Sequence, residues 1–266
     1  MDIVELFKNS LFYPTQDLGK VVLFGVLFVV MSILAILEAF GLGLRDYLGA
    51  TVVTIISSIL FIIITLIILG YSLNITRKTI KNVDGEIPEL DLLKNFIDGI
   101  KVAILTIVYY IIPVLVLLVV GFLTGAFVNV LQLVSYAATS GAGAIPQTLL
   151  SNLGASFLIT FLIAGIFFII FELLLTIARA VLAETESLAA AINIPAVFEK
   201  IGEIGWGNYI VWIVVFLILV LILGFISGFI GVIPFIGLII VSLVVKPYID
   251  MFSSRALGLI YNESKK

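Results

Sequence analysis

The chain has 266 residues, of which 62% are hydrophobic and 12% are charged, and its net charge is −3. Soluble domains are about half apolar and a quarter charged, so this composition excludes an ordinary water-soluble fold and predicts an integral membrane protein. The sequence has no cysteine and no histidine, which excludes thiol nucleophiles, disulfides, imidazole bases and the commonest zinc ligands, and the small charge gives no indication of nucleic-acid binding.

Residues 1–19 form an N-terminal segment ahead of the first apolar run. The segment starts with Asp2 and Glu5 instead of a basic region, so we expect no cleaved signal peptide. A helix that crosses a bilayer needs about 20 mainly apolar residues. The sequence therefore predicts an all-α polytopic fold, with one membrane domain over residues 1–266. Its six spans are residues 20–40, 51–73, 102–123, 152–178, 208–231 and 235–251, followed by a cytoplasmic tail at 252–266.

The third apolar stretch continues past Leu123 to Val134. We expect this helix either to tilt in the bilayer or to project beyond it. Pro113 lies in its middle and should kink it, because proline lacks the N–H that a helix interior needs.

Lysine and arginine occur in alternate loops of this plan. They lie before the first span, between the second and third spans, between the fourth and fifth, and at or after the end of the sixth. The remaining loops hold Arg45 alone. Because cytoplasmic loops carry the excess of basic residues, both termini are predicted to face the cytoplasm.

The chain contains an internal repeat of outgoing and returning helices. Each returning helix closes on an arginine, and these are Arg77, Arg179 and Arg255. Arg179 follows Arg77 by 102 positions, and the GFISG motif at Gly224 follows the GFLTG motif at Gly121 by 103. The agreement predicts parallel repeated hairpins. We interpret the glycine pairs first as internal packing sites and second as contacts between copies of the chain.

Amphipathic segments precede the outgoing helices. Apolar residues recur in them at spacings of three and four, with a polar opposite face. This pattern is typical of helices that lie in the membrane interface, and it also fits short helices packed against other loops. The segments are residues 91–101, 195–205 and, more weakly, 3–12.

Short motifs resemble a known family. They are FYPTQDLGKVVLFG (residues 12–25), GYSLNITRKTI (70–80), DGEIPELD (84–91) and DGIK (98–101). They resemble an archaeal multi-pass membrane family, domain-of-unknown-function family 4013, in which a Tyr-Pro element precedes the first span and a Leu-Pro-Glu-Phe-Asp-like element follows the second. Here these are Tyr13-Pro14 and residues 87–91, with Leu90 in place of the aromatic residue. The resemblance covers most of the chain and implies an archaeal plasma-membrane protein; it implies no activity and no site residue.

Glu172 is the most informative charged residue, because a charge within a bilayer is costly and needs a partner. If the repeat holds, Lys246 lies at nearly the same depth on the sixth span. We therefore predict a Glu172–Lys246 pair, with Lys246–Asp250 as a competing pair at i,i+4. Such a pair fits a coupling site for protons or ions, or a structural contact that fixes the register of two helices. Alternatively, Glu172 lies close enough to the membrane surface for its side chain to reach water. We weight the structural readings above the transport site.

Two function classes follow from these features. The first is a non-enzymatic membrane scaffold or accessory protein that engages membrane lipids, a membrane-protein partner or a second copy through interfacial helices. The second is a small-solute or ion transporter or channel that uses Glu172 and Lys246. The acidic linker at residues 84–91 does not match the spacing of an EF-hand loop, so we expect no metal. We also expect no cofactor and no catalytic residue.

Overall fold

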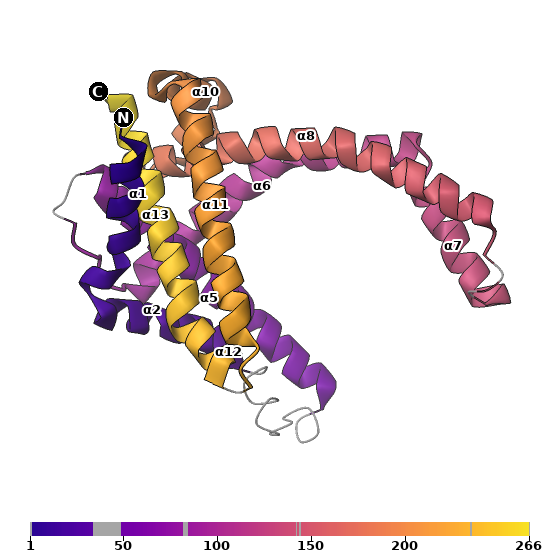
Figure 1. The fold of residues 1–266 in the computed structure, drawn as a ribbon, viewed down its shortest axis with the longest axis horizontal. Helices are drawn as coiled ribbons and strands as arrows, with labels where there is room; N and C mark the ends of the chain where they lie inside the picture. The colour runs from indigo at the N-terminus through magenta and orange to yellow at the C-terminus, as the bar shows by residue number, and fades with distance from the viewer. Residues whose placement is uncertain are drawn as a thin grey trace. The chain divides into compact units, whose positions relative to one another are not determined.

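The computed structural model describes residues 2–33, 49–81, 85–141, 143, 145–234 and 236–265. Over these ranges the chain is helical apart from short connections, with no β-strand (Figure 1), which confirms the predicted all-α class. In chain order the elements are α1 (Ile3–Phe12), η1 (Pro14–Gln16), α2 (Leu18–Met31), α5 (Ala50–Ile80), α6 (Leu92–Leu123), α7 (Ala126–Ser140), α8 (Gln147–Thr185), α9 (Leu188–Ile192), α10 (Ile194–Ile204), α11 (Trp206–Gly231), α12 (Ile236–Ile240), the π-helical η3 (Val241–Val245), α13 (Lys246–Asn262) and η4 (Glu263–Lys265).

Among the described residues, five helical runs are long and apolar enough to cross a membrane. They are Thr51–Ile80, Leu92–Leu123, Gln147–Thr185, Trp206–Gly231 and Ile236–Lys265. A sixth is present if Ile3–Gln16 and Leu18–Met31, which meet at 83°, count as one broken span. The predicted first span continues to residue 40, beyond the described residues. The hairpin order and the single-domain organisation stay predictions.

Most helices extend further than the predicted spans. The clearest corrections are at residues 91–101, which form the first turns of α6 instead of a separate interfacial helix, and at residues 252–262, which continue α13 instead of forming a tail. The arginines therefore lie within the last turns of their helices and do not end them. Hydropathy marks only the lipid-crossing part of a helix, whereas hydrogen bonding continues the helix until a breaker residue intervenes.

The predicted projection of the third helix is wrong, because this stretch forms two helices. α6 continues through Pro113 and ends at Leu123, and α7 starts after Gly125. Gly125 has φ 74°, a left-handed conformation that side-chain-bearing residues rarely adopt, so it breaks the helix. A Cβ on Gly121 would lie 2.7 Å from the Phe127 ring, so this glycine is an internal packing site.

The equivalent glycines of α11, Gly224 and Gly228, have no packed neighbour within 4 Å in the part of the chain that the structure describes. Phe225, Ile226 and Phe229 beside them are 69%, 46% and 64% exposed, and internal packing of this glycine pair stays a prediction.

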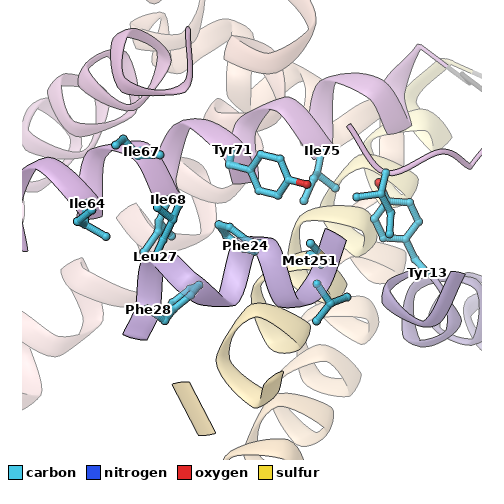
Figure 2. Close-up of a cluster of buried hydrophobic side chains, with 12 residues drawn as sticks. Tyr13, Phe24, Leu27, Phe28, Ile64, Ile67, Ile68, Tyr71, Ile75 and Met251 are labelled. Carbon is cyan, nitrogen blue, oxygen red and sulfur yellow. The ribbon is translucent and has the colours of Figure 1, made fainter. Parts of the chain in front are cut away.

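The chain divides into two compact units. The first unit comprises Met1–Leu105 and Ile177–Lys266, and the second comprises Thr106–Thr176. The core of the first unit joins α2, α5, α13 and the linker before α6 (Figure 2). Phe24 and Tyr71 lie at its centre with ring centroids 4.5 Å apart, and Tyr13 and Met251 pack in the same buried cluster.

Helices α5 and α6 cross in backbone contact within the first unit. A Cβ on Gly70 would lie 1.7 Å from the Asn95 carbonyl oxygen, and a Cβ on Gly99 would lie 1.8 Å from the Leu66 carbonyl oxygen. Only glycine permits such an approach. The crossing fixes which face of α6 turns inward.

The three amphipathic segments pack in different ways. In α10 the apolar residues Val197 and Ile201 are fully buried, so this helix rests its apolar face on the protein. α1 likewise buries Leu6 and Phe7. In the first turns of α6 the order is reversed, since Leu93 is 71% exposed and Asn95 is fully buried.

Candidate functional site

Three side chains hold the linker at residues 85–91 by donating hydrogen bonds to three consecutive carbonyl oxygens. An extended segment has no regular backbone partners of its own, so buried carbonyls there need side-chain donors. The three bonds are Tyr13 Oη to Glu86 O at 3.4 Å, Lys20 Nζ to Ile87 O at 2.7 Å and Tyr71 Oη to Pro88 O at 2.9 Å. We call this set the linker clasp.

Two charged side chains reinforce the linker clasp. Lys20 Nζ also lies 2.8 Å from the Glu89 carboxylate. The Arg255 guanidinium lies 5.0 Å from the centre of the Tyr13 ring, within the range of a cation–π contact. The clasp thus brings together the Tyr13-Pro14 element and the element at residues 87–91, the two motifs that carry the family resemblance.

A chain of five charged side chains, which we call the ion chain, joins α5, α6 and the end of α8. Arg77 and Asp98 lie at its centre, each 6% exposed, and the carboxylates and cations alternate along it. The contacts are Lys81–Glu186 at 3.6 Å, Glu186–Arg77 at 3.4 Å, Arg77–Asp98 at 2.9 Å and Asp98–Lys101 at 3.1 Å. Because cations and carboxylates alternate, each of the two buried charges, on Arg77 and Asp98, has an opposite charge beside it that offsets the free-energy cost of its burial.

Polar side chains also cross the interface between α5 and α13. The Ser72 hydroxyl donates to the Asp250 carboxylate. One turn further, the Thr76 hydroxyl donates to the Ser254 carbonyl at 3.1 Å. Arg255 Nη1 donates to Thr79 at 3.2 Å, so this helix-end arginine binds the end of α5.

The remaining helix-end arginine and the predicted lysine lie in the same unit as Asp250. Arg179 interacts electrostatically with the Asp250 carboxylate. Lys246 is partly buried and starts α13 directly after the π-helical turn at Val241–Val245. Ser72 donates a hydrogen bond to the Asp250 side chain, and Lys246–Asp250 is not among the ion pairs of the described residues.

Glu172 belongs to the second unit, where the Tyr110 hydroxyl donates to its carboxylate. Lys246 belongs to the first unit, so the Glu172–Lys246 pair stays a prediction. Two further side-chain contacts join α8 to α7 and to the break between α6 and α7. These are Thr124–Thr160 at 2.8 Å and Asn129–Ser156 at 3.1 Å. From Tyr110 through Thr124 to Asn129 the residue numbers rise while those of the partners on α8 fall, so α8 runs antiparallel to this stretch.

Asp98 and Asn95 lie on the polar face of the predicted amphipathic segment at residues 91–101, and the structure buries both. Tyr110, which binds the Glu172 carboxylate, was not singled out from the sequence. Gly70 and Gly99 could have indicated the buried face of α6. Close helix crossings need small residues, so the face that carries Gly99 turns inward.

The arrangement defines an all-helical protein whose apolar helices could cross a membrane and whose charged side chains contact one another at helix ends. The family described as "Protein of unknown function (DUF4013)" matches residues 53–232, more than half of the chain, and the chain belongs to this family. No curated protein and no solved structure matches the chain. The matched range includes nearly all of α5, the element at residues 87–91 and the ion chain.

Proposed function

We propose that the chain is a multi-pass, non-enzymatic scaffold or accessory protein of an archaeal plasma membrane. Its partners are membrane lipids, together with a membrane-protein partner or a second copy. The observation that carries this proposal is that the charged side chains within the helices make local contacts inside their own unit. Arg77 and Asp98 bind each other, and Asp250 and Glu172 accept hydrogen bonds from Ser72 and Tyr110. Transport sites usually leave such groups facing a water-filled path.

The outward apolar surface supports contact with lipid. The first turns of α6 expose Leu93 and Ile97, which are 71% and 50% exposed. Phe198 and Trp206 form an exposed aromatic pair, with ring centroids 4.9 Å apart, at the junction of α10 and α11. Tryptophan, with an apolar body and a polar N–H, favours the membrane interface, and Phe198 adds apolar surface beside it.

Both termini are proposed to face the cytoplasm. α1 packs against the end of α13, and a cavity of about 430 Å³ between them is lined by residues from both, including Asp2, Glu5, Asn262 and Lys265. The two ends of the described chain therefore lie at the same end of the first unit. This placement agrees with an even number of crossings and with the distribution of lysine and arginine.

Single-cysteine labelling tests the proposal, because the natural chain has no cysteine. Cysteines are placed one at a time along residues 165–176 and 237–247, and a membrane-impermeant thiol reagent is added from each side. We expect labelling only at the positions of each range that lie nearest the predicted cytoplasmic side. Labelling that continues along the Glu172 face deep into α8 would show a water-filled path and overturn the scaffold proposal.

A specific observation favours the second candidate, a small-solute or ion transporter. Val241–Val245 is π-helical and precedes Lys246, and single π-turns within helices frequently occur at functional sites. Gly25 packs here, since its Cβ would lie 1.9 Å from the Leu243 carbonyl oxygen. Uptake of solute by vesicles that contain the protein, lost in Glu172→Gln and Lys246→Met, would favour the transporter.

A further inference from the structure

One hydrogen-bond donor of the ion chain, on Arg77, has no partner among the described residues. Arg77 donates through Nε to the Ala183 carbonyl and through Nη1 to Asp98, but its buried Nη2 has no hydrogen-bond partner among the described residues. A guanidinium offers five N–H donors, and it binds phosphate and carboxylate oxygens in a fork. The ion chain also contains three cations, Arg77, Lys81 and Lys101, against two carboxylates.

Of the two carboxylates in the ion chain, Glu186 is the more exposed and the more weakly held. Glu186 is half-exposed, and its contacts with Arg77 and Lys81, at 3.4 and 3.6 Å, are longer than the 2.9 Å between Arg77 and Asp98. Its φ of 57° lies in the left-handed region, which is strained for a residue with a side chain. Glu186 can therefore be replaced from the outside without breaking the buried pair.

We propose that Arg77 and Lys81 bind a phosphate group in the place of the Glu186 carboxylate. The inference deepens the proposed function, because it names the headgroup chemistry of a lipid that the scaffold engages. A phosphate offers more acceptor oxygens than a carboxylate and so fits an arginine with unused donors. Phospholipid is the source that the neighbouring surface favours, since Leu93 and Ile97 expose apolar side chains on the same turns of α6 that carry Asp98.

The test measures binding of fluorescent phosphatidylglycerol to the full-length protein in detergent micelles, with phosphatidylcholine and inorganic phosphate as competitors. Each basic residue near an anionic lipid surface contributes enough to change affinity by about fivefold. Lys81→Gln is therefore expected to weaken binding by about fivefold, and Glu186→Gln, which removes the competing carboxylate, to strengthen it by a similar factor.

The Lys200–Glu203 pair supplies matched controls. It is a half-exposed lysine–glutamate pair at 2.7 Å on α10, so Lys200→Gln and Glu203→Gln carry the same charge changes outside the ion chain. We expect neither to alter the affinity. Competition by inorganic phosphate at comparable concentration would support the phosphate site and identify the free anion as its source. Equal affinity in all four variants would overturn the proposal.

This experiment is independent of the cysteine labelling. A dry bundle without phosphatidylglycerol binding contradicts the phosphate site alone. A water-filled path beside Glu172, in a protein that still binds phosphatidylglycerol through Lys81, contradicts the scaffold alone.

Discussion

Arg77 and Asp98 form an ion pair with 2.9 Å between Nη1 and Oδ2, and each side chain is only 6% exposed. Breaking a buried pair from one side leaves a poorly compensated charge and costs about 3–5 kcal/mol. We expect Asp98→Asn to lower the free energy of unfolding by about 3 kcal/mol, because Glu186 keeps a partial countercharge near Arg77. Unfolding of the purified protein by SDS, followed by circular dichroism, measures this loss.

The control for Asp98→Asn is Glu203→Gln, which breaks the exposed pair with Lys200. Exposed pairs contribute about 0–1 kcal/mol, so the expected loss is below about 1 kcal/mol. Equal losses in the two variants would show that burial does not set the strength of the Arg77–Asp98 pair.

The crossing of α5 and α6 predicts a sharp contrast between glycines. Gly70→Ala places a methyl group 1.7 Å from the Asn95 carbonyl oxygen, so the two helix backbones must separate. We expect a loss above about 3 kcal/mol, since overpacking against backbone cannot relax by rotation of a side chain. Thermal unfolding and gel filtration in detergent detect the loss.

Gly224→Ala is the matched substitution, because a Cβ there meets open space. An alanine in a helix is favoured over glycine by about 0.5–1 kcal/mol, so this variant should be as stable as the natural chain or slightly more stable. If Gly224→Ala instead disrupts an oligomer that the natural chain forms, the glycine pair of α11 is a contact between copies.

The linker clasp predicts that the loss of one hydroxyl exposes the segment at residues 85–91. Tyr71→Phe removes the hydrogen bond to the Pro88 carbonyl and keeps the ring in the core, at a cost of about 0.5–1.5 kcal/mol. We expect faster cleavage at Glu86 and Glu89 by a glutamate-specific protease. Tyr136→Phe, at an exposed tyrosine, should leave the cleavage rate unchanged. An unchanged rate in Tyr71→Phe would show that the other contacts hold the linker alone.

Hydropathy predicted the helical class and six apolar runs, five of which are confirmed among the described residues as helices long enough to cross a membrane. It could not place helix ends. Residues 91–101 were predicted as an interfacial segment because they have one polar and one apolar face, yet no helix breaker separates them from the span. The break that does exist depends on Gly125, one of several glycines in apolar surroundings, and its left-handed φ cannot be read from sequence.

The candidate site was harder to predict, because its parts are distant in the sequence. The Tyr13-Pro14 element and residues 87–91 were both singled out, but only the fold shows that Tyr13 binds the Glu86 carbonyl. The face of α6 that carries Asp98 was predicted as the polar face of an interfacial or loop-packed helix. In lipid the apolar face turns outward and the polar face inward, so the same periodicity has the opposite meaning.

The second unit predicts a measurable coupling between Asn129 and Ser156. Asn129 Nδ2 donates to Ser156 Oγ at 3.1 Å, from α7 to α8, and hydrogen bonds between helices in membranes are worth about 0.6 kcal/mol on average. In a double-mutant cycle of Asn129→Leu and Ser156→Ala we expect a coupling energy of about 0.6 kcal/mol, measured by SDS unfolding.

Thr139 is the control on the same helix, because its hydroxyl donates to the Ser135 carbonyl of α7 and not to α8. Thr139→Ala should therefore be additive with Ser156→Ala. Additivity in both cycles would mean that apolar packing and the α6–α7 break, and not polar contacts, align the two helices.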